Sequence, residues 1–127
     1  MPSPDVMADV LTRYAETFAR RDLEGLVALF TEDAVQADPA NVAPNVGHEA
    51  IATFFANAFA ASTASTWRAR SLHPCGEHVG ANFTVSVTME GGSMVIEGVE
   101  VFTFAEDGRI RAVSAYWGDG DVTFTPA

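Results

Sequence analysis

One carboxylate near the end of the chain stands among large apolar residues. Residues 98–104, GVEVFTF, have the composition of a β-strand, with Glu100 at its centre. Because side chains alternate along a strand, Glu100 shares its face with Met94, Ile96, Phe102 and Phe104. An ionised carboxylate on such a face is costly unless it is paired or hydrogen-bonded. A carboxyl group that stays neutral near pH 7 is the other solution, and enzymes use it in active sites.

Two further polar side chains could act with Glu100. Tyr14 lies on the apolar face of a predicted helix, and Asp38 directly precedes Pro39 at the end of an extended segment. Taken singly, Tyr14 could be a core residue and Asp38 an ordinary turn former. Removal of a proton next to a ketone, however, needs a base on one side and hydrogen-bond donors at the oxygen, where negative charge develops.

The two acids would need opposite protonation states for that chemistry. Asp38, near a loop and the mouth of a pocket, can keep partial hydration. Glu100, among Phe and Met side chains, cannot, so the two environments push the pKa values apart. The alternative for Glu100 is an outward or subunit-interface position, because Val95, Val99 and Val101 make the other strand face apolar as well.

Three helices are predicted in the first half of the chain. The Ser-Pro-Asp segment at residues 3–5 and apolar residues at every fourth position predict a helix over residues 4–20. Asp22 can cap a shorter helix over residues 23–30. Four large apolar residues at helical spacing predict a third helix over residues 48–59.

The second half of the chain alternates with a period of two, which predicts strands. We expect a short extended segment at 34–38, a loop at 39–47, and strands at 66–72, 82–89, 93–105 and 109–117. Turns at 90–92 and 107–108 make these consecutive antiparallel strands. Helices followed by a curved meander predict one α+β domain over residues 1–127, in which sheet and helices enclose an apolar pocket.

Composition narrows the class of ligand. The 127 residues carry a net charge of −10 with only seven Lys and Arg, which argues against nucleic acid or an anionic membrane surface as a partner. Neither a signal segment nor a membrane-spanning stretch is recognisable, so a cytoplasmic location is expected. The single Cys75 excludes an internal disulfide, and His48, His73 and His78 show no metal-ligand spacing.

Several motifs, in order, resemble those of the bacterial ketosteroid isomerases over about residues 5–118. They are RYAETF with Tyr14, LVALFTEDAVQADP with Asp38, GHEAIATFF, the strand of Glu100, and AYW with Trp117. The superfamily of that enzyme also contains polyketide cyclases and nuclear transport factor two-like proteins. The resemblance implies a cone-shaped fold in which three N-terminal helices pack on a curved, mostly antiparallel sheet.

The resemblance also implies a reaction that needs no cofactor. Asp38 would move a proton from C4 to C6 of a 3-oxo-Δ5-steroid, while Tyr14 and protonated Glu100 donate hydrogen bonds to the 3-oxygen of the dienolate. The chain would form a homodimer, and Trp117 would contact the base. The residues expected to contact the flat apolar substrate are Phe54, Phe55, Phe83, Val85, Val87 and Trp117.

Two positions depart from the family pattern. The strand acid is usually Asp, whereas this chain has the longer Glu100. Some members support the Tyr with two further Tyr residues, and the matching positions here are Phe30 and Phe55. A polyketide-cyclase-like enzyme and a ligand-binding or dimerisation domain without catalytic activity are the alternative functions.

Overall fold

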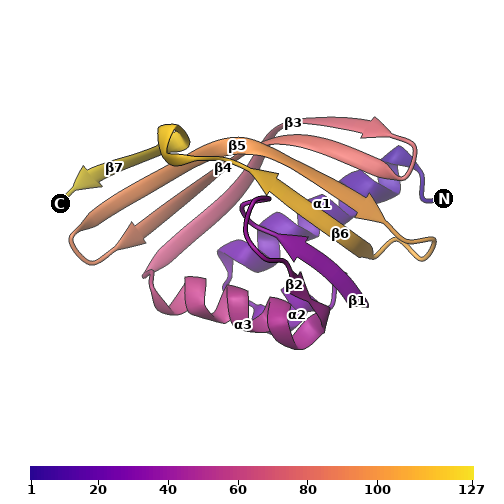
Figure 1. The fold of residues 1–127 in the computed structure, drawn as a ribbon, viewed down its shortest axis with the longest axis horizontal. Helices are drawn as coiled ribbons and strands as arrows, with labels where there is room; N and C mark the ends of the chain where they lie inside the picture. Colours follow the sequence, from indigo (N-terminus) through magenta and orange to yellow (C-terminus); the bar gives the residue numbers. More distant parts are fainter.

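Three α-helices lie against one face of a curved sheet (Figure 1). The computed structural model describes residues 1–127, and its helices are α1 (Pro4–Ala19), α2 (Leu23–Val27) and α3 (Gly47–Ala60). The helix start predicted at residues 3–5 and the predicted Asp22 cap are both present. The side chain of Ser3 accepts a hydrogen bond from the backbone of Val6, and that of Asp22 from Gly25. None of the helices has the length and apolarity needed to cross a membrane.

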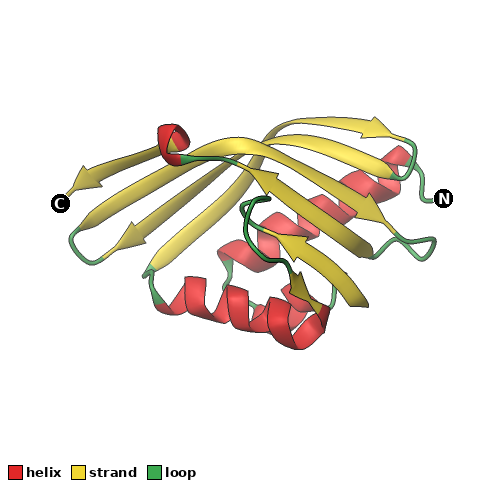
Figure 2. Ribbon diagram, in the orientation of Figure 1, coloured by secondary structure: helices red, strands yellow, loops and turns green.

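Seven strands form the sheet (Figure 2). They are β1 (Phe30–Ala37), β2 (Asn45–Val46), β3 (Ala64–Cys75), β4 (His78–Met89), β5 (Gly92–Phe104), β6 (Ile110–Tyr116) and β7 (Val122–Pro126). The strand order is β2-β1-β6-β5-β4-β3, and β7, which follows a 3-10 turn at Asp119–Asp121, pairs with β5. The predicted α+β class and the curved sheet covered by helices are therefore confirmed.

Some predicted boundaries are wrong. The second helix ends at Val27 and not at residue 30, because Phe30 already pairs with Ile110, whose N–H donates to the carbonyl of Leu29 at 2.8 Å. Tertiary pairing thus overrides the helical pattern. The strand expected at 34–38 starts at Phe30, and the expected loop at 39–47 contains β2. The final strand β7 was not predicted.

The pairing of β1 with β6 is parallel, in a sheet that is otherwise antiparallel. Ala37 at the end of β1 lies beside Ser114 of β6. Parallel strands end at the same edge of a sheet, so residues just past their ends come together. Asp38 and Trp117 are those residues.

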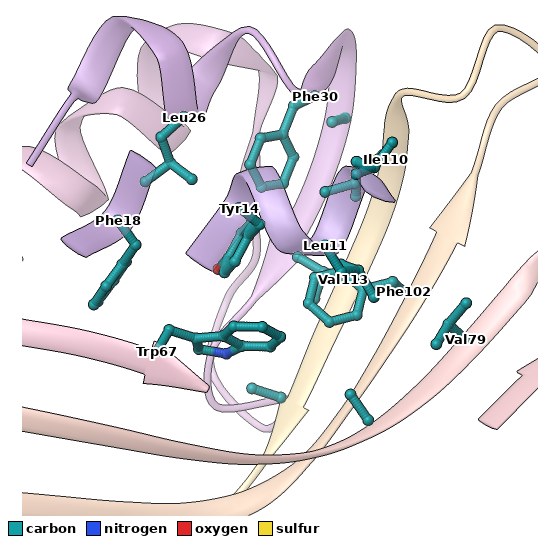
Figure 3. Close-up of a cluster of buried hydrophobic side chains, with 14 of the residues drawn as sticks. Leu11, Tyr14, Phe18, Leu26, Phe30, Trp67, Val79, Phe102, Ile110 and Val113 are labelled. Atoms are coloured by element: carbon teal, nitrogen blue, oxygen red, sulfur yellow. The ribbon is translucent and has the colours of Figure 1, made fainter. Parts of the chain in front are cut away.

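The core lies between the helices and the concave face of the sheet. Apolar side chains of all three helices and of β1, β3, β4, β5 and β6 meet there, and Figure 3 shows part of this cluster. Its members without measurable exposure include Met7, Leu26, Phe30, Ile51, Phe102 and Ile110. Each buried side chain of this size contributes about 1.5–3 kcal/mol to folding, and together they fix α1 and α3 against the sheet.

Gly98, two residues before Glu100, lets a neighbouring backbone come close. A methyl group at this position would lie 2.5 Å from the carbonyl oxygen of Tyr116 and 3.1 Å from the Cβ of Trp117. A separation of 2.5 Å is well inside van der Waals contact. Glycine at 98 therefore allows the chain after β6 to place Trp117 beside β5.

We predict that Gly98→Ala lowers the free energy of unfolding by about 1–3 kcal/mol, because the added methyl group forces the end of β6 away from β5. Urea denaturation measures the change. Gly120→Ala is the matched control, because nothing lies within 4 Å of a methyl group there. Equal stability of the two variants would contradict the close-approach argument.

Candidate active site

A cavity of about 320 Å³ opens between the helices and the concave face of the sheet. Fourteen of its 18 lining residues are hydrophobic, and Tyr14, Asp38 and Glu100 all lie on its wall. The structure thus brings together the three residues that the sequence singled out for chemistry. It also places every predicted substrate-contacting residue on the wall: Phe54, Phe55, Phe83, Val85, Val87 and Trp117.

Glu100 points into the cavity from the middle of β5 and is 4% exposed. Its neighbours on the flanking strands are Ala81 of β4 and Ala115 of β6, and both are buried. Residues opposite one another across strands have their side chains on the same face. Two methyl groups leave room for a carboxyl group where larger residues would fill the space. The outward alternative for Glu100 does not hold.

A single hydrogen bond holds the carboxyl group of Glu100. The indole Nε1 of Trp67, on β3, donates to Oε1 of Glu100 at 2.8 Å. No Lys, Arg or His lines the cavity, and no ion pair involves this carboxylate. Burial raises the pKa of Glu100 to about 8; the Trp67 bond opposes that rise and the charge of Asp38 adds to it. Glu100 is therefore mostly protonated at pH 7.

Asp38 lies one residue past β1 and is half-buried. The indole Nε1 of Trp117 donates to its Oδ1 at 2.7 Å, and the N–H of Ala40 donates to the carbonyl of Ala115 at 2.7 Å, which ties the chain after Asp38 to β6. Burial raises the pKa of Asp38, and the hydrogen bond from Trp117 lowers it. The result is a carboxyl group that is more basic than a free Asp.

Tyr14 reaches the cavity from α1 with its ring packed among other aromatic rings. Ring centroids lie 4.9 Å away for Trp67, 5.6 Å for Phe102 and 6.3 Å each for Phe30 and Phe55, all in edge contacts. Figure 3 shows Tyr14 with Trp67, Phe102 and Phe30 around it. Phe30 and Phe55 thus contact the ring without offering a hydroxyl group.

The hydroxyl group of Tyr14 makes no hydrogen bond within the protein, so its proton is available to a ligand. Burial raises the pKa of Tyr14 well above its ordinary value, and the charges of Glu100 and Asp38 raise it further. Tyr14 therefore stays protonated throughout the neutral range.

The sequence analysis missed part of the site. Trp67 is the main omission: alternation placed it on one strand face, but nothing in the sequence indicated that β3 would bring it to Glu100. The remaining lining residues come from α1, from α3 and the segment after it, and from β3, β4 and β5, and they are Phe18, Ala58, Ala61, Ser62, Ser65, Met89, Met94 and Ile96. For Met89 and Met94, the alternation of side chains along the predicted strands already indicated the face that lines the cavity. Nowhere in the structure do three His, Cys, Asp or Glu side chains gather as a metal would require.

Comparisons with known proteins agree on the family. The family model for the SnoaL-like domain matches residues 11–113. The curated steroid Δ-isomerase of Nocardioides simplex is 31% identical over 125 residues, which cover 98% of this chain and 99% of that protein. The epoxide hydrolase LasB of Streptomyces lasalocidi is also 31% identical, over 136 residues; this alignment covers 98% of this chain and 46% of that protein.

Solved structures share the fold at low sequence identity. The epoxide hydrolase/cyclase-like enzyme SalBIII superposes with a TM-score of 0.90 at 22% identity, covering 98% of this chain and 100% of that one. RV0760c from Mycobacterium tuberculosis gives 0.88 at 20%, with the same coverage. A computationally designed 17-OHP binder gives 0.86 at 20%, covering 94% of this chain and 98% of that one. The predicted family is confirmed: this chain belongs to the SnoaL-like domain family, which has the nuclear transport factor two-like fold.

Proposed function

We propose that this protein isomerises a 3-oxo-Δ5-steroid, or a ketone of similar flat shape, to the conjugated Δ4 ketone. One observation carries the proposal. A single apolar cavity holds a half-buried carboxylate, a buried carboxyl group with a pKa of about 8, and a phenol without a partner in the protein. Near-full-length identity of 31% to a steroid Δ-isomerase supports the same reaction.

The reaction is a proton transfer in two steps. The carboxylate of Asp38 removes a proton from C4, and the C–H electron pair moves toward the 3-oxygen to form a dienolate. Tyr14 and Glu100 donate hydrogen bonds to that oxygen as its negative charge grows. Asp38 then returns the proton to C6, and the double bond becomes conjugated with the ketone. Atoms and charge balance without a cofactor.

The two carboxyl groups divide the work because their surroundings differ. Glu100 is 4% exposed and has the larger pKa rise, so it keeps its proton at neutral pH. Asp38 is more exposed, and the indole of Trp117 stabilises its ionised form. A raised pKa also makes Asp38 a stronger base, which suits removal of a weakly acidic proton.

The walls of the cavity favour a neutral, flat, apolar ligand. Aromatic side chains from both helices α1 and α3 and from the sheet, together with aliphatic side chains of β4 and β5, form most of the lining. The cavity volume is at the lower end of the usual range of about 300–1,000 Å³ for ligand sites. The net charge of −10 disfavours anionic ligands.

A second candidate reaction is the opening of an epoxide by a hydroxyl group of the same substrate. The identity to LasB favours it, and so does the acid-base pair itself. Asp38 would take the hydroxyl proton, the oxygen would attack an epoxide carbon, and Glu100 would protonate the oxygen released when the C–O bond breaks. Cyclisation of a hydroxy-epoxide, in the absence of ketone isomerisation, would select this reaction.

We also propose a homodimer that uses the outer face of the sheet. Val99 of β5 and Tyr116 of β6 are register partners on this face, and they are 42% and 54% exposed. Val101 extends the apolar surface along the same strand, whereas the exposed Glu97 separates Val95 from it. A second copy related by a two-fold axis would cover this surface with an identical one.

The isomerase proposal predicts a rise in enone absorbance when the protein is mixed with 5-androstene-3,17-dione. Asp38→Asn should lower turnover by about 10²-fold or more, because Asn keeps the shape of Asp but cannot accept the proton. The exposed Asp33, also on β1, provides the control variant Asp33→Asn. A flat absorbance trace would refute the isomerase, and near-full activity of Asp38→Asn would remove Asp38 from the mechanism.

Protonation of Glu100 predicts how stability depends on pH. The pKa of Glu100 is about 8 in the folded chain and 4.5 in the unfolded chain. The stability that the folded chain gains by holding this proton is therefore fully present below pH 4.5 and is lost as pH rises through 8. The variant Glu100→Gln has no titratable group at this position and lacks this pH dependence. We expect the stability of the native chain relative to this variant to decrease between pH 5 and pH 8 by up to about 1.4 kcal/mol per pH unit.

Urea unfolding at several pH values tests that expectation. Glu97→Gln is the control, because it makes the same substitution on the opposite, 56% exposed side of β5 and should give a much smaller pH dependence. A pH-independent difference between the native chain and Glu100→Gln would mean that Glu100 is ionised in the folded protein.

The dimer proposal predicts that Val99→Asp is a folded monomer, because the substitution brings two carboxylates together at the two-fold axis. Light scattering after size-exclusion chromatography gives the mass. Thr12→Asp, on the exposed side of α1, is the control and should remain dimeric. A native chain that is monomeric, or a dimeric Val99→Asp, would reject this interface.

A further inference from the structure

Each of the two site acids is held by one indole group. Trp117 donates to Asp38 and Trp67 donates to Glu100, at 2.7 and 2.8 Å. The two tryptophans come from different parts of the sheet, since Trp117 follows β6 whereas Trp67 lies on the edge strand β3 and reaches past β4 to β5. The proposed reaction gives Trp67 no role so far.

Trp67 decides which oxygen of Glu100 can donate. An indole N–H is a donor only, so Oε1, which it contacts, must act as an acceptor. In a protonated acid the carbonyl oxygen is the stronger acceptor, so the hydrogen bond from Trp67 favours the form with the carbonyl at Oε1 and the proton on Oε2. We propose that Trp67 is a positioning residue that fixes Oε1 as the acceptor and thereby directs the Oε2–H group to the ligand oxygen. This inference rests on the proposed function of Glu100 as an oxyanion donor.

No other side chain in the cavity competes with Trp67 for a hydrogen bond to the carboxyl group of Glu100. The titratable groups that share the cavity with Glu100 are Tyr14 from α1 and Asp38 from the end of β1, and no cationic side chain lines it. Neither Tyr14 nor Asp38 forms a hydrogen bond with Glu100 in this structure. Without Trp67, the three rotatable bonds of Glu100 would allow either oxygen to face the ligand.

The indole itself has little freedom to turn. Trp67 is 5% exposed, and its ring lies in edge contact with Tyr14 at 4.9 Å and with Phe102 at 6.0 Å between centroids (Figure 3). One rigid side chain therefore contacts the ring of one proposed oxyanion donor and the carboxyl group of the other. That arrangement sets the distance between the two donors before a ligand binds.

The first test removes only the N–H group. Site-specific replacement of Trp67 by 3-benzothienylalanine keeps the ring shape, and ¹³C-labelled Glu side chains report the titration of Glu100 by NMR. The N–H donor favours the ionised form, so we expect the Glu100 midpoint to move to higher pH. The same replacement at Trp117 is the matched control and should move the midpoint of Asp38, seen with ¹³C-labelled Asp. An unchanged Glu100 midpoint would overturn the proposal.

The second test asks whether Trp67 acts through Glu100. Trp67→Phe should lower kcat for 5-androstene-3,17-dione about tenfold, the effect of one hydrogen bond in the transition state, and change KM by less than threefold. In a Glu100→Ala background, the same change should lower kcat by less than twofold. Equal losses in both backgrounds would show that Trp67 contributes packing alone and would reject the proposal.

The two tests separate the possible failures. If the native chain does not turn over the ketone, the proposed function fails, and the NMR titration together with binding of the phenolic steroid equilenin still decides the role of Trp67. The benzothienylalanine variant should bind equilenin about tenfold more weakly than the native chain if Trp67 aims the donor. Equal affinity would count against it.

Discussion

The burial of one carboxyl group in an apolar cavity constrains the rest of the site. A charged carboxylate in such a place would cost several kcal/mol, and no cation is near enough to Glu100 to offset that cost. The fold instead keeps the group protonated and provides one neutral donor for its carbonyl oxygen. The small residues Ala81 and Ala115 on the flanking strands supply the space. The neutral carboxyl group provides a hydrogen-bond donor at neutral pH, but it lowers the stability of the folded chain at high pH.

The remaining site residues come from separate parts of the fold. Helix α1 brings Tyr14, the parallel pair β1 and β6 brings Asp38 together with Trp117, and β3 brings Trp67. Rigid elements, fixed by a shared core, therefore set the distances between the base and the donors. Flexible loops contribute little: the segment after Asp38 is itself tied to β6 through the hydrogen bond of Ala40.

Sequence reasoning recovered what depends on periodicity and failed where long-range register decides. The period of two in β4 and β5 correctly assigned Phe83, Val85, Val87 and Glu100 to the cavity face. The parallel pairing of β1 with β6 joins segments more than 70 residues apart, and no local signal marks it. The contact between Trp67 and Glu100 depends on the register of three strands, including a shift in β3 between Ala69 and Ser71. The boundary at Phe30 was missed because pairing with Ile110 overrode a helical pattern.

The chain contains two tryptophans, and each forms a hydrogen bond with one of the two cavity acids. All of its intrinsic indole fluorescence therefore originates at the site, with no background from elsewhere in the molecule. The two tyrosines differ in their surroundings, because Tyr14 is buried in the cavity whereas Tyr116 is 54% exposed on the outer face of the sheet. The unmodified protein thus carries its own optical reporters for ligand entry and for the charge state of both acids.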